Sequence, residues 1–108
     1  MKLFISVILF ALSASVFAHT PEQCRDRALV EYEISGQPSD VYYTLSEGMV
    51  VAAGAPILGA QQQELARYTS DMIVYTVSGS YHSGWFQDLM VVDPWNCSLV
   101  RFFNLYAE

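Results

Sequence analysis

The chain has 108 residues, 53% of them hydrophobic, and its five Lys and Arg stand against eleven Asp and Glu, a formal net charge of −6. Proteins that bind nucleic acids or anionic membranes normally present basic clusters, because these replace the counterions of phosphate groups. The composition therefore argues against both kinds of partner. It is compatible with a soluble protein that meets a basic protein.

The first eighteen residues have the pattern of a secretory signal. Lys2 supplies a positive start, an apolar segment runs from Leu3 to Leu12, and small residues occupy the cleavage positions in Val16-Phe17-Ala18. The apolar segment is about ten residues long, half of what a transmembrane helix needs. We expect residues 1–18 to be a signal peptide and the mature protein to be secreted.

The remaining residues, 19–108, are predicted to form one domain, near the size at which a single hydrophobic core is only just sufficient. This segment begins at His19 and contains two cysteines, Cys24 and Cys97. Because an exported chain meets an oxidising compartment, we predict a disulfide between them; the alternative is two thiols that stay free or pair with another chain. The bond would close a loop of roughly 70 residues and contribute about 4 kcal/mol.

The first half of this domain gives mixed signals. From Leu29 to Ile34 apolar residues alternate with glutamates, which predicts a half-buried strand. Helical spacing of apolar residues predicts a helix over Val41 to Ala53, ended by Gly54. The aromatic and β-branched residues of the same segment favour an alternative, a hairpin of Val41 to Leu45 and Met49 to Ala53.

The second half is clearer. Gln61 to Arg67 fits a short helix or an irregular crossover. Three segments rich in β-branched and aromatic residues follow, at Met72 to Val77, Trp85 to Val92 and Cys97 to Leu105, and Asp93-Pro94-Trp95-Asn96 between the last two suits a tight turn. These segments are expected to form an antiparallel meander, so the predicted fold is α+β, with one main helix packed on an antiparallel sheet.

The last of these strands is apolar on both faces. Simple alternation places Leu99, Phe103 and Leu105 on one face and Val100, Phe102 and Tyr106 on the other. One face can pack on the helix. The other keeps more aromatic surface than a solvated face requires, so it is either a contact surface or is covered by a crossover segment.

Candidate groups for catalysis are few. No carboxylate pair, nucleophile elbow or Cys-x-x-Cys motif is present, so we expect neither catalytic residues nor a cofactor. His19, as the first residue after cleavage, could chelate copper through its amine and its ring, and His82 could complete such a site. A small copper-binding protein is therefore a minor alternative.

Two segments carry a family resemblance. The stretch EYEISGQPSDVYYTLSEGMVVAAG resembles the first strand, polar turn and helix of the small fungal guanyl-specific ribonucleases and of the ribonuclease-like effectors secreted by powdery mildew fungi. Further on, VSGSYHSG followed by QDLMVVDPWNCSLVRFFNL is similar in spacing to the Ser-Gly-Gly-Val-Tyr loop and final hairpin of that family. The resemblance covers Glu31 to Leu105. It implies a ribonuclease-like fold for a protein that acts on a plant host.

The enzymes of that family cleave RNA with a glutamate, histidines and a phosphate-binding arginine. Asp88 matches the Asp that precedes this arginine, but Leu89 stands at the arginine position itself. The final histidine position falls near Leu105, and the glutamate position falls near Ile73 or Val74. Aliphatic side chains can neither transfer protons nor stabilise phosphate, so the resemblance implies a scaffold without its chemistry.

These observations lead to one main hypothesis and one alternative. The main hypothesis is a secreted, monomeric, non-enzymatic effector, a virulence or avirulence factor that works in or on host cells through contacts with a host protein such as an immune receptor. The alternative is a bacterial exported binding module, meaning an inhibitor, an immunity protein or a toxin subunit. The contact candidates, in or beside loops, are Tyr81, His82, Trp85 and Trp95.

Overall fold

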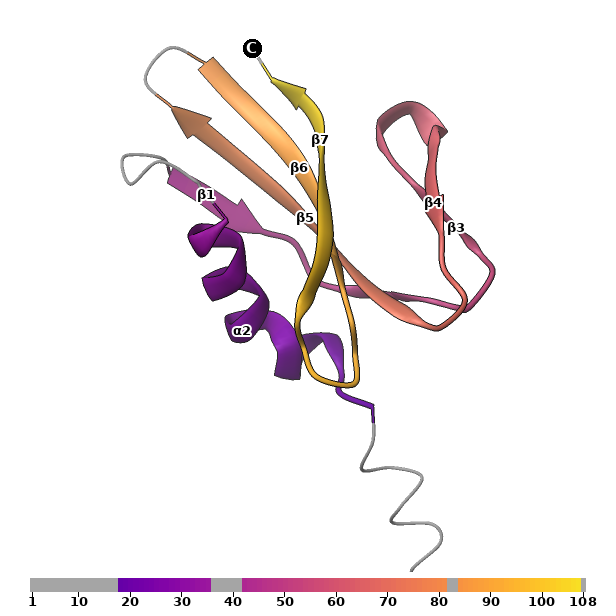
Figure 1. Ribbon diagram of the computed structural model, residues 1–108. Helices are drawn as coiled ribbons and strands as arrows, with labels where there is room; N and C mark the ends of the chain where they lie inside the picture. The colour runs from indigo at the N-terminus through magenta and orange to yellow at the C-terminus, as the bar shows by residue number, and fades with distance from the viewer. Residues whose placement is uncertain (1–17, 36–41, 82–83, 108) are drawn as a thin grey trace, which may run out of the picture.

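The computed structural model describes residues 18–35, 42–81 and 84–107; the predicted signal peptide, apart from Ala18, lies outside this part of the chain. The predicted α+β architecture is confirmed, with an α-helix, α2, packed on an antiparallel five-stranded sheet (Figure 1). The elements are α2 (Pro21–Ile34), β1 (Tyr42–Leu45), β2 (Met49–Val51), β3 (Pro56–Leu58), the 3-10 turn η1 (Ala60–Gln62), β4 (Glu64–Arg67), β5 (Met72–Tyr81), β6 (Gly84–Val92) and β7 (Leu99–Ala107). The sheet order is β1-β5-β6-β7, β2 also pairs with β5, and β3 and β4 form a separate hairpin.

Helix α2 replaces the strand predicted at Leu29 to Ile34, and that prediction was wrong. The helix begins with a capping box, in which the Thr20 side chain accepts from the Gln23 main chain and the Gln23 side chain accepts from the Thr20 main chain. Pro21 at the first turn has a suitable fixed φ. The helix buries Cys24, Ala28 and Tyr32, which are spaced by four residues and share one face. Val30 and Ile34, the other apolar members of the supposed strand face, are exposed.

The helix predicted over Val41 to Ala53 is also wrong, because its described part forms β1 and β2. The hairpin alternative identified two strands but not their pairing. Both strands lie antiparallel along β5, with Leu45 opposite Val77 and Met49 opposite Val74. Three residues between them, 46–48, face only two residues of β5, so one extra residue forms a bulge along this edge.

Gly48 lies in this bulge, close to the start of α2 and to β5. A Cβ atom at this position would lie 2.6 Å from the Pro21 Cβ and 2.7 Å from the Tyr75 Cε2. The Tyr75 hydroxyl donates a hydrogen bond to the Pro21 carbonyl, which fixes both groups against the glycine. The close approach therefore requires a residue without a side chain.

Polar contacts also tie α2 to the sheet. The Arg25 guanidinium donates to the carbonyl oxygens of Leu45 at 2.7 Å and Ser46 at 2.8 Å. Further along the helix, the Glu31 carboxylate accepts from the Leu99 main-chain nitrogen at 3.3 Å. The helix is thus joined to both outer parts of the sheet, at β1 and at β7.

The predicted disulfide is confirmed. Cys24 in the first turn of α2 is bonded to Cys97 in the β6–β7 connection, with a Cα–Cα distance of 4.9 Å. Both cysteines belong to the buried cluster between the helix and the sheet. The bond therefore joins the start of the helix to the connection between the last two strands of the meander.

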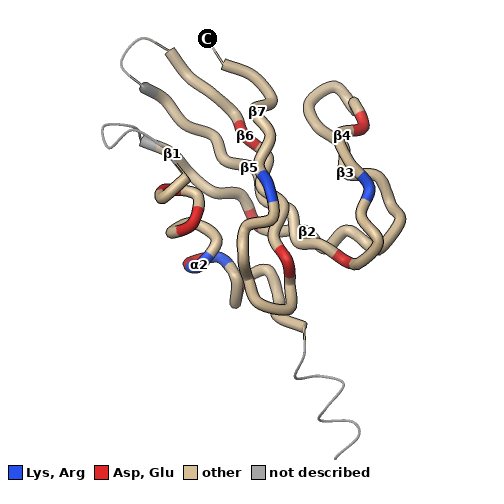
Figure 2. The backbone as a smooth tube through the Cα atoms, in the orientation of Figure 1, with Lys and Arg blue, Asp and Glu red and all other residues tan. Residues whose placement is uncertain are grey.

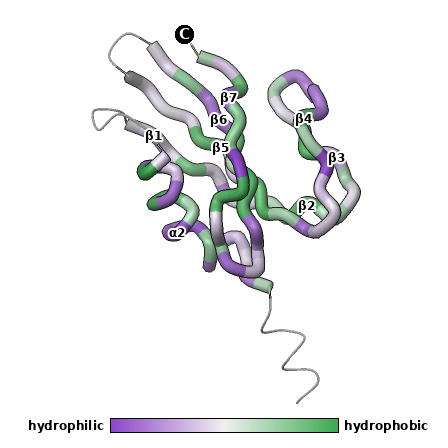
Figure 3. Tube along the Cα trace, in the orientation of Figure 1, coloured by the Kyte–Doolittle hydropathy of each residue, from purple (hydrophilic) through white to green (hydrophobic). Residues whose placement is uncertain are grey.

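The predicted meander is confirmed as well: β5 and β6 extend beyond the predicted segments at one end, and β7 begins and ends two residues later than predicted. Hydrophobic residues concentrate where these strands run side by side (Figure 3). The segment from Gln61 to Arg67 is neither a plain helix nor a crossover, because it divides between η1 and strand β4. No helix in the described part of the chain is long and apolar enough to cross a bilayer.

The distribution of β7 side chains between the two faces of the sheet differs from the one that simple alternation predicts. The β6–β7 register shifts twice, at Gln87/Asp88 and at Val91/Val92. As a result Leu99 packs with Phe102 on the helix side, while Phe103 packs with Leu105 on the opposite side. That second face is covered in part, as the second interpretation expected, but by the β3–β4 hairpin that packs against it rather than by a crossover.

The disulfide yields the first prediction. Replacing both cysteines, Cys24→Ser with Cys97→Ser, should lower the free energy of unfolding by about 4 kcal/mol, because the unfolded chain regains the freedom of a long loop. Denaturant titration of the double variant beside the oxidised wild type measures this. A loss below about 1 kcal/mol would show that packing alone holds α2 in place.

The close approach at Gly48 yields the second. Gly48→Ala should cost about 1–3 kcal/mol, since the added methyl group overlaps a proline ring and a buried aromatic ring. Gly54→Ala is the matched control, because its Cβ meets no atom within 4 Å and only the positive φ of 81° opposes it. Thermal unfolding should therefore show a larger loss for Gly48→Ala, and the reverse order would contradict the packing argument.

Candidate functional site

The candidate site is a groove on the sheet face opposite α2, between the β3–β4 hairpin and the strands β2, β5 and β6. It has a volume of about 480 Å³. Its lining is mainly apolar, from Met49, Val51, Ile57, Leu58, Val74 and Leu89. Met49 is 67% exposed and Leu58 is 44% exposed, so the groove presents large hydrophobic side chains to solvent.

Buried contacts hold the hairpin across this face. Ile57 and Leu65 of the hairpin belong to the same cluster as Leu89 and Leu105 of the sheet. At the hairpin tip, a Cβ on Gly59 would lie 2.9 Å from side-chain atoms of both Leu65 and Leu105, so the tip rests closely on β7. One wall of the groove is therefore a packed element and not a loose loop.

Hydrogen bonds fix the base of the hairpin. The Ala53 nitrogen donates to the Asp71 carboxylate at 2.9 Å, and the Gly54 nitrogen donates to the Tyr68 carbonyl at 2.8 Å. Arg67 donates to the Gly54 carbonyl at 2.8 Å and forms an ion pair with Glu64. The chain reversal before β3 relies on Gly54, whose φ of 81° is in the left-handed region.

The groove face is suited to binding apolar groups rather than to proton transfer. Strand positions on this side, by register, alternation and packing, include Thr44, Met49, Val51, Met72, Val74, Thr76, Ser78, Ser80, Trp85, Gln87, Leu89, Val91, Arg101, Phe103, Leu105 and Tyr106. Within that described set no side chain is an Asp, Glu or His. Glu47 is the one carboxylate among the described residues that line the groove.

The four predicted contact residues do not gather at this site. Trp85 stands at the start of β6, half exposed, with its ring 4.4 Å from that of Tyr106. Trp95 lies in the β6–β7 connection, beyond the other end of β6, and is also half exposed. The structure therefore places the two tryptophans at opposite ends of one strand. His82 and the side chain of Tyr81 lie outside the described residues.

Sequence reasoning missed the groove because it misassigned two of its walls. The predicted helix includes Met49, which only the hairpin alternative places in a strand, and no element is predicted at Ile57 and Leu58. The available signal was the run of β-branched and aromatic residues around Met49, which favoured strands over a helix.

The resemblance aligns Asp88 with the Asp before the catalytic arginine. In the structure Asp88 is buried and hydrogen-bonded. Its side chain is 2% exposed and accepts from the Tyr32 hydroxyl at 2.5 Å and from the Asn104 amide at 2.8 Å. A buried carboxylate needs such donors, because an unpaired one is very costly. Asp88 thus joins α2, β6 and β7.

The positions aligned with the lost catalytic groups are packing positions. Leu89, Leu105 and Val74 belong to the cluster under the β3–β4 hairpin. Ile73 belongs to the cluster under the helix. Each candidate position is therefore occupied by an aliphatic side chain that contributes to one of the two cores.

Two tyrosines near Asp88 have perturbed acidity. Burial, with a further effect from the hydrogen bond to Asp88, raises the pKa of the Tyr32 hydroxyl far above its ordinary value. Burial and the hydrogen bond to Glu33 raise the pKa of Tyr43 to about 12. The rings of Tyr32 and Tyr43 meet edge to face at 5.7 Å, so the two groups form one polar and aromatic unit at the end of α2.

Most of the charged residues in the described part of the chain belong to α2 or to turns (Figure 2). The four arginines are separated, and each already has a partner: Arg25 binds main-chain oxygens, Arg27 pairs with Glu31, Arg67 pairs with Glu64, and Arg101 lies 4.6 Å from the centre of the Phe103 ring. The described part of the chain therefore has no cluster of basic side chains.

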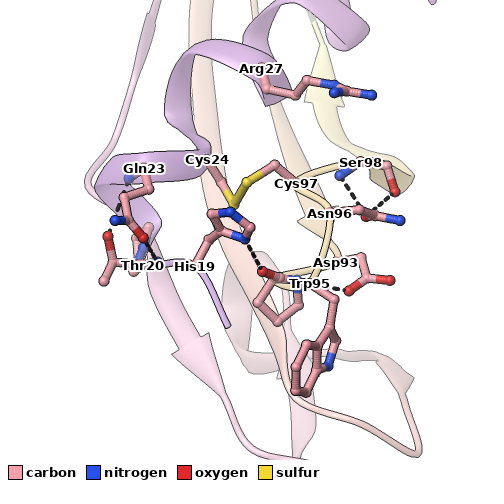
Figure 4. The surroundings of a disulfide bond; sticks show 12 residues. His19, Thr20, Gln23, Cys24, Arg27, Asp93, Trp95, Asn96, Cys97 and Ser98 are labelled. Carbon is pink, nitrogen blue, oxygen red and sulfur yellow. Dashed lines mark hydrogen bonds between the residues drawn. A yellow bond between two sulfur atoms is a disulfide. The ribbon is translucent and has the colours of Figure 1, made fainter. Parts of the chain in front are cut away.

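His19, the minor copper candidate, lies against the disulfide (Figure 4). Its main-chain nitrogen and its Nδ1 lie 2.8 and 2.9 Å from the Pro94 carbonyl oxygen. Chelation of copper by the amine and this ring nitrogen would have to break both contacts. The strand ends that flank His82, Tyr81 and Gly84, pair with each other at the opposite end of β6 from Pro94.

The Tyr32–Asp88 bond yields the third prediction. Tyr32→Phe should lower the free energy of unfolding at pH 7 by about 2 kcal/mol, because a buried carboxylate loses a donor. It should also weaken the alkaline loss of stability. Below about pH 10, the ordinary value, Tyr32 is protonated in both states and its contribution is complete; above it the unfolded chain releases the proton first, so stability falls by about 1.4 kcal/mol per pH unit.

Denaturant titrations between pH 8 and pH 11 measure this slope. Tyr43 and Tyr75, whose pKa values are also raised, stay in the variant, so part of the slope should remain. The wild type, titrated in parallel, supplies the full slope for comparison. An unchanged slope in Tyr32→Phe would contradict the role given to this hydroxyl.

No protein-family model, curated protein or solved structure matches this chain. The ribonuclease resemblance therefore stays a prediction that rests on its quoted segments. The first of these, from Glu31 to Gly54, was interpreted as strand, turn and helix, whereas its described parts are the end of α2 and the strands β1 and β2. The second segment contains β6 and β7, which do form the expected hairpin.

Proposed function

We propose that this chain is an exported, non-enzymatic binding protein that acts through contacts with another protein. In its specific form, which the resemblance implies, it is a ribonuclease-like effector that meets a host protein, such as an immune receptor, in or on host cells. The observation that carries the proposal is the groove between the β3–β4 hairpin and the sheet, with its exposed Met49 and Leu58.

The groove has properties expected of a contact site for a protein segment. Large apolar side chains that stand exposed beside a concave surface typically mark interaction sites. Met49 is well suited to such a site, since its flexible thioether side chain adapts to different partners. A partner would fit by placing one or two apolar side chains between Met49 and Leu58.

Charge indicates which partner fits best. Without the predicted signal peptide the chain has four arginines and eleven acidic residues, a formal charge of −7. Each arginine is engaged within the protein, whereas Glu47 lies at the groove rim. The proposed partner therefore presents apolar side chains flanked by Lys or Arg, because opposite charges accelerate and orient association.

Export is supported by the pattern of the first eighteen residues and by the disulfide. Structural disulfides persist in oxidising compartments, and Cys24–Cys97 is buried in the core of this domain. A bacterial exported binding module would use the same groove and the same charge. Groove variants would therefore lose binding to the partner protein in both cases.

The fourth prediction concerns the groove. Purified wild-type protein should capture a specific protein from host extract, and Met49→Asp with Leu58→Asp should weaken binding to that protein by tenfold or more, since carboxylates would meet the partner's apolar groups. Titration calorimetry on the purified pair measures the change. The double variant should still fold, because surface substitutions usually alter stability by less than about 0.5 kcal/mol.

The matched control is Val30→Asp with Val100→Asp, which adds the same charge at exposed apolar residues of α2 and β7 away from the groove lining. This control should bind like the wild type. Equal losses in both double variants would indicate a general charge effect and remove the groove from the proposal. RNA cleavage that depends on His82 would overturn the non-enzymatic function itself.

A further inference from the structure

His19, Cys24 and Cys97 form a compact group of metal-binding atoms outside the groove. The ring nitrogen of His19 and the two sulfur atoms all lie within 4.8 Å of one another. His19 precedes α2, Cys24 is in its first turn, and Cys97 is in the β6–β7 connection (Figure 4). In the disulfide form the sulfur atoms are bonded to each other and are not available as thiolates.

The hydrogen bond to Pro94 gives His19 the tautomer that a metal ligand needs. A carbonyl oxygen can only accept, so in the neutral ring Nδ1 carries the proton that points to the Pro94 oxygen at 2.9 Å. Nε2 then keeps a free electron pair. Metal-binding histidines typically have this arrangement, in which the other ring nitrogen donates to a carbonyl or carboxylate group. The main-chain bond from His19 to the same oxygen, at 2.8 Å, holds the residue in place.

We propose that the reduced chain binds one Zn²⁺ ion through the Sγ atoms of Cys24 and Cys97 and the Nε2 atom of His19. A dithiol reductant supplies two electrons and two protons, which convert the disulfide to two thiols while the dithiol itself becomes a disulfide. Zinc then displaces both thiol protons. Two thiolates and one neutral imidazole balance the charge of the ion, and water fills the fourth position of the tetrahedron.

The distances require only a small adjustment. Ligand atoms about 2.0 to 2.3 Å from a zinc ion lie roughly 3.5 Å from one another, so the sulfur atoms must separate on reduction and the imidazole must approach slightly. Cys24 and Cys97 are on elements that the rest of the core already holds together. His19 is exposed, which gives the ion a path to the two less accessible sulfur atoms.

With this site, either of two links could join the same two elements of the fold. In the oxidised protein the disulfide joins α2 to the β6–β7 connection, and in the reduced protein the zinc ion would do so. Because the unfolded chain does not hold the three ligands together, zinc binding would stabilise the folded state. This inference is independent of the proposed groove and its partner.

The fifth prediction tests it with zinc and cobalt ions. The full mature chain is reduced with a phosphine under anaerobic conditions, freed of reductant and titrated with Zn²⁺ against a chromophoric chelator, and Co²⁺ is used to detect thiolate charge-transfer bands. We expect one ion per chain, an increase in the unfolding temperature on adding Zn²⁺, and no binding by the oxidised protein. His19→Ala should weaken Zn²⁺ binding at least tenfold, whereas His82→Ala, which also removes one histidine, should bind like the wild type.

Circular dichroism recorded before metal addition shows whether the reduced chain keeps its sheet. If it unfolds, Zn²⁺ should restore the sheet signal in the wild type and in His82→Ala but not in His19→Ala. Equal affinities in the two histidine variants, or binding that persists in the oxidised protein, would overturn the proposal. So would a zinc-to-chain ratio of one half, since the ion would then join cysteines of two chains.

Discussion

The fold depends on how α2 is fixed to one face of the sheet. The helix is short, and an isolated helix of this length is only marginally stable in water. Two ties act at its ends: the disulfide from Cys24 at the start, and the hydrogen bond from Tyr32 to Asp88 near the finish. Between them the small side chain of Ala28 is fully buried. The helix is therefore held by specific bonds, to which the hydrogen bonds of Pro21, Arg25 and Glu31 also contribute, rather than by a broad hydrophobic stripe.

This arrangement divides the sheet into two unlike faces. The helix side is closed, and its buried cluster contains the disulfide and most of the large apolar side chains. Among the described residues, the opposite side is covered by the two short strands β3 and β4, which cannot span the three long strands β5, β6 and β7. Open space remains beside the hairpin, and Met49 and Leu58 border it. The groove is thus a direct result of covering a large sheet with a small hairpin.

Sequence patterns predicted the second half of this fold better than the first, for physical reasons. The meander could be predicted because long runs of β-branched and aromatic residues strongly favour strands. The disulfide followed from export and from the presence of only two cysteines. The segment containing Tyr32 was misleading because apolar and acidic residues alternate there, although only Tyr32 is buried. The capping box of Thr20 and Gln23 was the local evidence for a helix, and it lies before the segment that was assigned as a strand.

The sequence carries a signal for the strand at Met49 but not for the groove itself, because the groove depends on packing between distant segments. Alternation along β2 identifies side chains on one face, but nothing local to Met49 indicates that Leu58 will stand opposite it. The bulge at residues 46–48 is equally nonlocal, since Gly48 is needed by the contact with Pro21 and Tyr75. The register shift at Val91/Val92 then places Leu99 and Phe102 on one face, whereas strict alternation places them on different faces.

The hairpin also bears on why a ribonuclease-like scaffold would lack charged groups on this face. Leu89 and Leu105, which the resemblance aligns with an arginine and a histidine, are the side chains on which Ile57 and Leu65 pack. A charged group at either position would lie under the hairpin without a partner, and the cost of desolvating it would push the hairpin off the sheet. The same strand surface therefore cannot carry both a packed hairpin and charged catalytic groups. In the proposed binding protein, Leu89 lines the groove and Leu105 packs in the same cluster, so aliphatic side chains at these two positions support the hairpin and the groove beside it.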